Sequence, residues 1–522
     1  MWHGWTVRPA LATLVGIALS AACADDGAAP VAAETGTSST GSPSPTTGES
    51  SAGPDTTTTT AADTLDVTFE ITTYDTQPMV ADLAVTSEVP VTVTVRHRSD
   101  SGVIVSPLGD EPGPQRFRAR GLLPDTSHEF AYEATADDGR IAEGTFVFDT
   151  PAALPAFVGA FAVEGTRVPA APLYRLSDYN PFPFGDFAGA IMIDASGITR
   201  WFLSAPTTLA GPQAVWVGLK LRADGTIAYL QGDSFFIRDE LGEIVAEIPA
   251  TDLGLSWLHH DVHELPSGNL MALSRTYREI DYPDLGPTLV CGDLLVEFTL
   301  EGEVVWTWDA FDHLDPMRRR DGFDDPLPDP VTDEVGNDWT HGNGFIVDER
   351  QGTITLSLRH QDWIVQLDRV DGDVLWRLGD GGDFALREGD RWFFHQHSPQ
   401  WQPDGSLLLY DNGNGNPEVA DDDVHSRAVR IALDTTGMTA SLAWQDDEAP
   451  FATVFAGDAD RIEGGHILVT DSSIFNRDGM NTRYRELDPQ RVPQRIWTAW
   501  SPPNRWSYRT TAHTGLVGEP LR

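Results

Sequence analysis

The sequence predicts an all-β protein in which a small β-sandwich is followed by a β-propeller. Tryptophan, phenylalanine and tyrosine are plentiful, Gly and Pro are frequent, and no long heptad stretch rich in Ala, Glu, Lys and Leu occurs, which favours strands and turns over helices. Apolar residues alternate with polar ones between residues 64 and 152, and from residue 153 to 522 the chain repeats short turn-and-strand units. A chain of 522 residues is long enough for two such bodies.

Residues 1–23 have the composition of an export signal. After Arg8, an apolar stretch over residues 11–22 ends in small residues directly before Cys23. It is too short to span a bilayer and has the ending of a signal cleavage site. A Cys after two alanines resembles a lipoprotein processing site, with ordinary signal-peptidase cleavage as the alternative. We therefore expect an exported protein, periplasmic or on the outer surface, which meets the membrane only through a lipid anchor on Cys23.

Residues 24–63 consist mainly of Gly, Ser, Thr, Pro and Ala. Such a segment has almost nothing to bury, so it predicts a disordered tether. A tether directly behind a lipidated cysteine would hold a folded body away from a membrane surface.

Between residues 64 and 152 apolar side chains occupy every second position, which is the period of half-buried strands. The clearest examples are Val67, Phe69 and Ile71, and later Val91, Val93 and Val95. The segment GLLPDT at 121–126, followed by Phe130 and Tyr132, resembles the late part of a fibronectin type III domain. We expect residues 64–152 to form a fibronectin type III-like β-sandwich.

From residue 153 onward two sequence elements alternate. One is a Gly-containing turn before an apolar strand, and the other is a turn Gly with Trp four places later, as at Gly197, Gly302 and Gly372. Each pair supplies two hairpins, enough for one four-stranded blade that buries its faces against its neighbours. The repeat units are centred near Gly197, Gly225, Gly268, Gly352, Gly405 and Gly465. Their number predicts a six-bladed β-propeller over residues 153–522.

The charge balance limits the partners. A formal net charge of −44 and a pI near 4.4 argue against nucleic-acid binding, because phosphate backbones are held by clustered Lys and Arg. The same charge repels an anionic substrate at long range, so sulfate or phosphate chemistry would need a local cationic pocket. The two cysteines, Cys23 and Cys291, do not predict a disulfide framework.

Three histidines stand at related places in the repeats. His260 and His397 each precede a turn glycine by eight residues, and His341 precedes Gly352 by 11. Equivalent positions of successive blades face one axis, so these imidazoles could meet in a central cavity. The alternative is that each histidine caps a turn. Their neighbours His259 and His360 rank lower, because alternation puts them on the other strand face.

Arg359 ends the strand predicted over residues 353–358. A guanidinium keeps its charge in a dry pocket and offers a planar fork to tetrahedral oxyanions. A structural ion pair is the alternative for this residue. Three converging imidazoles could also form a zinc site, which would indicate a metal-dependent hydrolase.

Three segments together resemble the bacterial arylsulfate sulfotransferase family. They are LHHD at 258–261 with LPSGN at 265–269, DWTHGN at 338–343 running to RHQ at 359–361, and QHSP at 396–399 running to YDNGN at 410–414. The resemblance covers the body from about residue 153 and extends to the small sandwich. It implies a six-bladed propeller that moves a sulfuryl group from an aryl sulfate to a phenol without a nucleotide sulfate donor, a metal or another cofactor.

The resemblance also implies roles for single residues. His397 corresponds to the nucleophile, His260 and His341 to further pocket histidines, Arg359 to the pocket arginine, and Asn343 to a substrate-binding neighbour. A disulfide of some members has no counterpart here. Neutral imidazole is a good nucleophile near pH 7, so a ping-pong transfer through a sulfohistidine is chemically reasonable.

Two matters stay open at this point. A surface propeller that binds a ligand or partner without turnover would keep the same fold, and the sequence leaves the oligomeric state undetermined. The acidic segment 309–338 could be a lid, a cation-binding loop or a solvated insertion.

Overall fold

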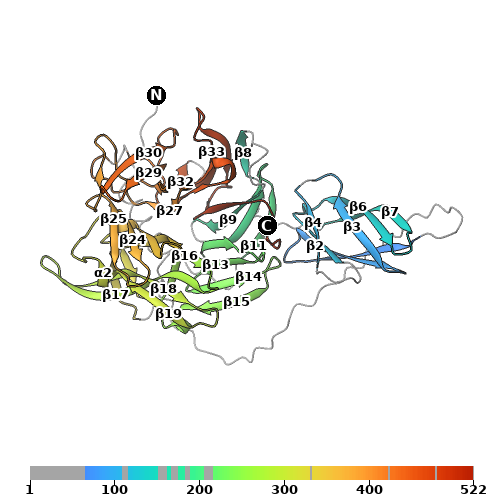
Figure 1. The fold of residues 1–522 in the computed structure, drawn as a ribbon, viewed down its shortest axis with the longest axis horizontal. Coiled ribbons are helices and arrows are strands. Elements are labelled where there is room, and N and C mark those ends of the chain that lie inside the picture. Colours follow the sequence, from blue (N-terminus) through green and yellow to red (C-terminus); the bar gives the residue numbers. More distant parts are fainter. Residues whose placement is uncertain are drawn as a thin grey trace.

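The computed structural model describes residues 65–520, apart from residue 101 and the segments 109–115, 151–160, 166–173, 183–187, 205–214, 330–331, 421–423 and 477–478. The prediction of a mostly β protein is confirmed, since the described residues form many small, mainly antiparallel sheets (Figure 1). No helix among these residues is long and apolar enough to cross a bilayer. The predicted signal, tether and lipidated Cys23 lie outside the described residues, so export and anchoring stay predictions.

Two sheets pack face to face in the N-terminal part of the described chain, drawn in blue in Figure 1. The first sheet contains β1 (Val67–Thr73), β2 (Val80–Ser87), β5 (Arg116–Arg120) and β4 (Ile104–Pro107) in that order. The second contains β3 (Val91–His97), β6 (Ser127–Ala136) and β7 (Ile141–Asp149). One apolar core between them includes Leu83, Val93, Phe117 and Phe130, so the alternation in the sequence reflects burial on one face of each sheet.

The remaining described strands form six sheets arranged in a ring in Figure 1. The first joins β11 (Thr199–Ser204), β10 (Gly189–Asp194), β9 (Tyr174–Pro181) and β35 (Arg505–Trp506), with β36 (Thr510–His513) also paired to β9. The second joins β12 (Trp216–Leu221), β13 (Ile227–Gln231), β14 (Ser234–Arg238) and β15 (Ile244–Pro249). The third joins β16 (Leu258–Glu264), β17 (Leu270–Tyr282), β18 (Gly286–Phe298), β21 (Val335–Asp338) and β20 (Pro326–Pro328), with β19 (Val304–Asp309) also on β18.

The last three sheets continue the ring. The fourth joins β22 (Gly342–Asp348), β23 (Thr353–Leu358), β24 (Trp363–Asp368) and β25 (Val374–Gly379). The fifth joins β26 (Ala385–Leu386), β30 (Thr439–Gln445), β29 (Arg427–Asp434), β28 (Leu407–Asp411) and β27 (His397–Trp401). The sixth joins β31 (Asp458–Arg461), β32 (Ile467–Asn476), β33 (Gly479–Leu487), β34 (Arg495–Trp500) and β8 (Ala162–Gly165). Short helical turns occur at η2 (Ala250–Leu253), α2 (Ala310–His313), η3 (Arg359–Gln361) and η5 (Glu463–Gly465).

Strands from both ends of this body close the ring. Strand β8 pairs with β34, and strands β35 and β36 return to pair with β9 of the first sheet. Strands from distant parts of the chain are thereby joined within one sheet by backbone hydrogen bonds, which leaves fewer exposed strand edges. The described fold is therefore propeller-like.

The inner strands are interrupted where they reach the centre of the ring. The register shifts within β12, β16, β22 and β27, which marks β-bulges. His260, His341 and Ser398 have left-handed φ values of 58°, 48° and 51°, a conformation that non-glycine residues rarely adopt. A bulge redirects side chains that simple alternation would point elsewhere, and the candidate site lies at these bulges.

The sandwich is fixed to the ring by buried ion pairs. Glu240, after strand β14, accepts hydrogen bonds from Arg118 at 2.7 Å and from Nε of Arg120 at 2.5 Å, both on β5. In the opposite direction, Arg200 of β11 reaches Asp100 of the sandwich at 2.7 Å. Buried charges of this kind are tolerated only when they are paired, so the two bodies form one interlocked unit at this contact.

The acidic segment 309–338 is folded against the fourth sheet. Arg318 donates to the backbone carbonyl of Gln361 at 2.8 Å, and its guanidinium lies 3.8 Å from the ring centre of Trp363. Arg320 pairs with Asp362 at 3.1 Å. At its end the segment becomes strand β21, which runs parallel to β18 and carries Asp338. The segment thus places Asp338 behind the histidines of the site described next.

Candidate active site

A cavity lies at the centre of the ring, and each of the six sheets or its adjoining loops contributes to its lining. Its atom-free space is about 610 Å³, part of it open to solvent. The lining includes Val217, Trp257, His259, His260, His341, Arg359, His397, Phe455, Trp506 and Tyr508. The structure therefore brings His260, His341, His397 and Arg359 into one hollow.

His397 begins the inner strand β27 and is almost fully buried. Its Nδ1 lies 2.7 Å from the side-chain oxygen of Asn412. The Asn412 amide nitrogen donates to the carbonyl of Ala456 at 2.8 Å and to Thr453 at 3.0 Å. Because a carbonyl only accepts, this fixes the Asn412 oxygen toward His397. Nδ1 of His397 must then carry the proton, and Nε2 keeps its lone pair.

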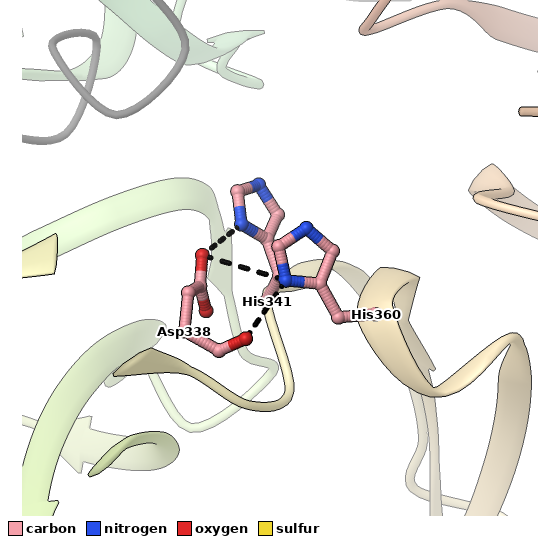
Figure 2. A group of neighbouring side chains, drawn as sticks. All are labelled: Asp338, His341 and His360. Atoms are coloured by element: carbon pink, nitrogen blue, oxygen red, sulfur yellow. Dashed lines mark hydrogen bonds and ion pairs between the residues drawn. The ribbon is translucent and has the colours of Figure 1, made fainter. Parts of the chain in front are cut away.

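His341 is backed by a carboxylate instead of an amide. Its Nδ1 lies 2.5 Å from Oδ2 of Asp338. Figure 2 shows His341 and His360 beside this one carboxylate, with Nδ1 of His360 3.0 Å from the backbone carbonyl of Asp338. The Nδ1–H of His341 therefore donates to Asp338 and its Nε2 keeps a lone pair. A carboxylate in this place stabilises an imidazolium as it forms.

Arg359 lies in the turn η3, directly after strand β23, and is 6% exposed. Its Nη1 donates to Nε2 of His360 at 2.5 Å, while the Nδ1–H of His360 donates to the Asp338 carbonyl. His360 thus orients the guanidinium from behind. The backbone N–H of Arg359 donates to the carbonyl of His341 at 3.1 Å, which holds the two residues side by side.

The zinc alternative predicted from the sequence would use the three converging imidazoles of His260, His341 and His397. Among the described residues, the group whose ligand atoms lie within 4.8 Å of one another is a different one, Asp338, His341 and His360. Both ring nitrogens of His360 already have hydrogen-bond partners, and one partner is the cationic Arg359. A guanidinium 2.5 Å from His360 Nε2 disfavours a metal cation bound at the same nitrogen. The hydrogen bonds account for this cluster, and no step of the chemistry below is assigned to a metal.

His260 lies inside the bulge of β16, and its ring centre is 5.0 Å from that of His341. Its Nδ1 lies 2.7 Å from Nδ1 of His259. His259 also lines the cavity, because the bulge turns both neighbours toward the axis. The expectation that alternation sends His259 to the other strand face is therefore wrong.

Burial makes these imidazoles weakly basic. It lowers the pKa of His397 well below its usual value, with the Arg359 guanidinium adding to the effect. Burial, followed by repulsion from His260, lowers the pKa of His341 in the same way. The pKa of His260 falls to about 3, through burial and then Arg275. All three imidazoles are therefore neutral near pH 7, and Arg359 supplies the positive charge of the cavity.

The rest of the lining is largely aromatic. Trp257, Phe455, Trp506 and Tyr508 form this part of the wall, and the ring centre of Tyr508 is 5.8 Å from that of His397. Trp506 and Tyr508 come from the C-terminal segment that pairs with the first sheet. Planar apolar surfaces beside polar groups suit an aromatic ring.

Asn343 is fully buried and lies outside the cavity lining. Its amide nitrogen donates to the carbonyl of Gln396 at 2.7 Å. Its own backbone carbonyl accepts from the Tyr508 hydroxyl and from Nη2 of Arg509, both at 2.9 Å. These contacts position the floor of the cavity. Direct substrate binding by the Asn343 side chain stays a prediction from the resemblance.

Sequence reasoning assigned no role to Asp338, Asn412 or Tyr508. Asn412 stood in a segment that carried the resemblance, and Asp338 preceded His341 by three residues, so both had a weak signal. Tyr508 had none, because it follows the last repeat. Asp338 contacts His341 within one turn of chain and Asn412 contacts His397 across one hairpin, whereas Tyr508 reaches the pocket only through the tertiary fold.

The fold and the cavity define a propeller-like β protein with a cationic, histidine-rich pocket at its centre. The family model described as arylsulfotransferase (ASST) matches residues 168–509. The chain belongs to this family, which confirms the resemblance stated above.

Similar proteins include the arylsulfate sulfotransferase AssT of Escherichia coli O6:H1 (strain CFT073), which is 22% identical over 355 residues, or 54% of this chain and 57% of AssT. The AssT of Lelliottia amnigena is 23% identical over 329 residues, or 51% and 53% of the two chains. The chain thus spans about half the length of these relatives.

Among solved structures, a protein of unknown function from Bacteroides caccae is 10% identical, with a TM-score of 0.39 over 63% of this chain and 93% of that one. A putative 6-phosphogluconolactonase from Bacteroides fragilis is 10% identical, with a TM-score of 0.32 over 79% and 99%. Both TM-scores are low, and neither likeness bears on function.

Proposed function

We propose that this protein transfers a sulfuryl group from an aryl sulfate to a phenol in two half-reactions, with His397 carrying the group between them. The main support is the neutral Asn412 amide, which holds the proton of His397 on Nδ1 and leaves the Nε2 lone pair toward the cavity. In this proposal the six sheets are the blades of a six-bladed propeller, and the preceding sandwich is of the fibronectin type III kind.

The first half-reaction breaks the bond between sulfur and the aryl oxygen. The lone pair of His397 Nε2 attacks sulfur, a nitrogen–sulfur bond forms, and the phenolate leaves with the bonding electrons and takes up a proton. In the second half-reaction the acceptor phenol oxygen attacks sulfur and loses its proton, and the electrons of the nitrogen–sulfur bond return to Nε2. Because Nδ1 stays protonated, the leaving group is a neutral imidazole, which makes this bond labile.

The three sulfuryl oxygens need positive charge or hydrogen-bond donors. Arg359 supplies a fixed cation, and charge on these oxygens strengthens in the transition state. Binding of the sulfate anion raises the pKa of nearby imidazoles, since an opposite charge favours the protonated form. His341 responds most strongly, because Asp338 stabilises its imidazolium. His397 lacks such a carboxylate and stays neutral. The nucleophile and the group that assists it therefore differ in protonation state.

The wall formed by Trp257, Phe455, Trp506 and Tyr508 would hold the aryl ring of donor and acceptor in turn. One ring-sized pocket can serve both, because the first phenol leaves before the second arrives. Aryl sulfates and phenols are therefore the proposed small-molecule partners, with no nucleotide sulfate donor.

A chromogenic aryl sulfate and an acceptor phenol test this proposal directly. Purified protein should release nitrophenol from nitrophenyl sulfate and form the sulfated acceptor, and mass spectrometry after brief exposure to donor should find a sulfated His397. His397→Ala should abolish both signals. His466→Gln is the matched control, because His466 pairs with Glu486 at 2.9 Å away from the cavity. Undiminished release from His397→Ala would overturn the mechanism.

The same assay separates this enzyme from a propeller that only binds a ligand or partner. A non-catalytic protein would show saturable binding of the aryl sulfate without nitrophenol release. Activity lost on treatment with a chelator would instead indicate the metal-dependent hydrolase considered above.

A further inference from the structure

Behind His260 lies a chain of buried groups that the mechanism above leaves unused. Nδ1 of His260 is 2.7 Å from Nδ1 of His259, and Nε2 of His259 is 3.4 Å from Oδ1 of Asp293 on β18. This nitrogen is buried and makes no hydrogen bond to any described residue, so its approach to Asp293 is an ion-pair contact without hydrogen-bond geometry. The other Asp293 oxygen accepts from the backbone N–H of Gly342 at 2.6 Å and from the Thr340 hydroxyl. The chain runs away from the cavity.

Two facing Nδ1 atoms at hydrogen-bond distance share one proton, so one must donate and the other accept. In one arrangement His260 donates, His259 carries its single ring proton on Nε2 toward the Asp293 carboxylate, and His260 Nε2 presents a lone pair to the cavity. In the other, His259 donates, Asp293 is protonated toward His259, and His260 Nε2 presents N–H to the cavity. The two arrangements differ by one proton, and neither contains an imidazolium.

We propose that His259 and Asp293 are positioning residues which, through His260, store the proton that passes between the two phenols. The inference rests on the proposed function and deepens it by assigning the source and the destination of that proton.

The steps balance over one cycle. When the donor phenolate leaves, it takes the proton from His260 Nε2. The shared proton moves from His259 to His260, the Asp293 proton moves to Nε2 of His259, and a carboxylate remains. When the acceptor phenol attacks the sulfohistidine, its proton enters at His260 Nε2 and the same three transfers run backward. No oxidant, metal or further reactant takes part.

The electrostatics agree with this route. Burial raises the pKa of Asp293 to about 7, so its protonated and ionised forms are both accessible near neutral pH. The pKa of His260 is about 3, which disfavours an imidazolium and favours the neutral exchange. The charged and titratable groups facing the chain are Arg275 of β17, Cys291 of β18, Asp338 of β21, His341, Arg359 and Arg509. A second small hollow lined by Arg275, Asp293 and Asp338 adjoins the chain.

His341 cannot store and return the proton in this way. Its Nδ1–H is held by the Asp338 carboxylate at 2.5 Å, so Nε2 becomes a donor only when the ring is charged. That arrangement suits a group that holds sulfuryl oxygens. The chain behind His260 suits a group that exchanges a proton without changing the charge of either ring.

The test compares donors that differ in their need for a proton. Nitrophenolate leaves unprotonated, whereas unsubstituted phenolate has a conjugate acid with a pKa of about 10, like tyrosine. Asp293→Asn and His259→Gln keep hydrogen-bonding capacity but cannot relay a proton. We expect each to slow the first half-reaction with phenyl sulfate by roughly 10²-fold or more, the contribution typical of general acid catalysis. The loss with nitrophenyl sulfate should be less than about tenfold.

The pH profile gives a second readout, which a purely structural role would not change. Wild-type phenyl sulfate turnover in the first half-reaction should decline as the pH rises through about 7, and this limb should disappear in Asp293→Asn. His263→Gln is the matched control, since His263 lies on the same strand and does not line the cavity. Comparing two donors within one folded variant removes the effect of partial misfolding.

Two results would overturn the inference. One is an equal loss with both donors in both variants, and the other is an unchanged pH profile in Asp293→Asn. Failure of the proposed function is distinguishable, because His397→Ala would then still release nitrophenol. If His397→Ala is inactive while Asp293→Asn and His259→Gln lose activity equally with both donors, only the proposed proton store is refuted.

Discussion

Asn412 offers the sharpest test of how this pocket prepares its nucleophile. The Asn412→Ala variant removes the oxygen that lies 2.7 Å from Nδ1 of His397. Without it the proton of His397 is free to move to Nε2, which removes the lone pair that would attack sulfur in the proposed mechanism. A buried hydrogen bond left unmade costs about 1–3 kcal/mol, which corresponds to a roughly 5- to 150-fold lower kcat/KM.

The Asn412→Asp variant changes the sign of the neighbouring charge. A carboxylate would stabilise the His397 imidazolium and raise its pKa, so activity should fall more at pH 6 than at pH 9. The donors that Asn412 gives to Thr453 and Ala456 are also lost, so some destabilisation will accompany the change.

The assay is the burst of nitrophenol from nitrophenyl sulfate, measured beside the melting temperature of each variant. Asn414→Ala is the matched control, because Asn414 lies in the same loop and donates to the Val454 carbonyl at 2.7 Å without contacting His397. Asn412→Ala activity within twofold of wild type would refute the reasoning. So would a loss that the Asn414→Ala control shares.

Three other perturbations follow from charges described above. Arg359→Lys keeps the charge but loses the planar fork, so kcat/KM for aryl sulfates should fall by roughly 10- to 100-fold; equal steady-state rates would contradict this. Glu240→Ala leaves two arginines of the sandwich without their shared carboxylate and should cost about 3–5 kcal/mol, measured by calorimetry, with a smaller loss for Glu240→Gln. His260 and His360 have pKa values of about 3, so below about pH 6.5 the unfolded chain binds more protons than the folded one. The free energy of unfolding should therefore fall as the pH falls, by about 1.4 kcal/mol per pH unit for each histidine. Identical melting temperatures at pH 7 and pH 5 would contradict this prediction.

The repeats in the sequence predicted much of the fold. Turn glycines and alternation located the strands, because both reflect local backbone geometry and one-sided burial. The spacing of His260 and His397 from their turn glycines indicated a common axis. The spacing could not reveal that His260 lies inside a bulge whereas His397 lies directly before one, since bulges add residues without changing the hydrophobic pattern.

Other residues of the site could not be predicted from local sequence patterns, for a different reason. Asp338 lies only three residues before His341, but its carboxylate is held at the site by strand β21, which pairs in parallel with β18. His259 faces the cavity because a bulge overrides alternation. Tyr508 arrives from the segment after the last repeat, which returns to β9. Only the position of Tyr508 depends on a pairing between segments far apart in the chain.

Ring closure by the final strands has a consequence for biogenesis. Arg509 bonds Asp261, Asn343 and Ser398 of three different sheets, at 2.6, 2.9 and 3.0 Å, beneath the chamber that Tyr508 helps to line. A polypeptide that stops at residue 504 would already hold the cavity histidines named above, yet its chamber would lack this base. If the proposed function holds, a molecule truncated there should leave aryl sulfates untouched.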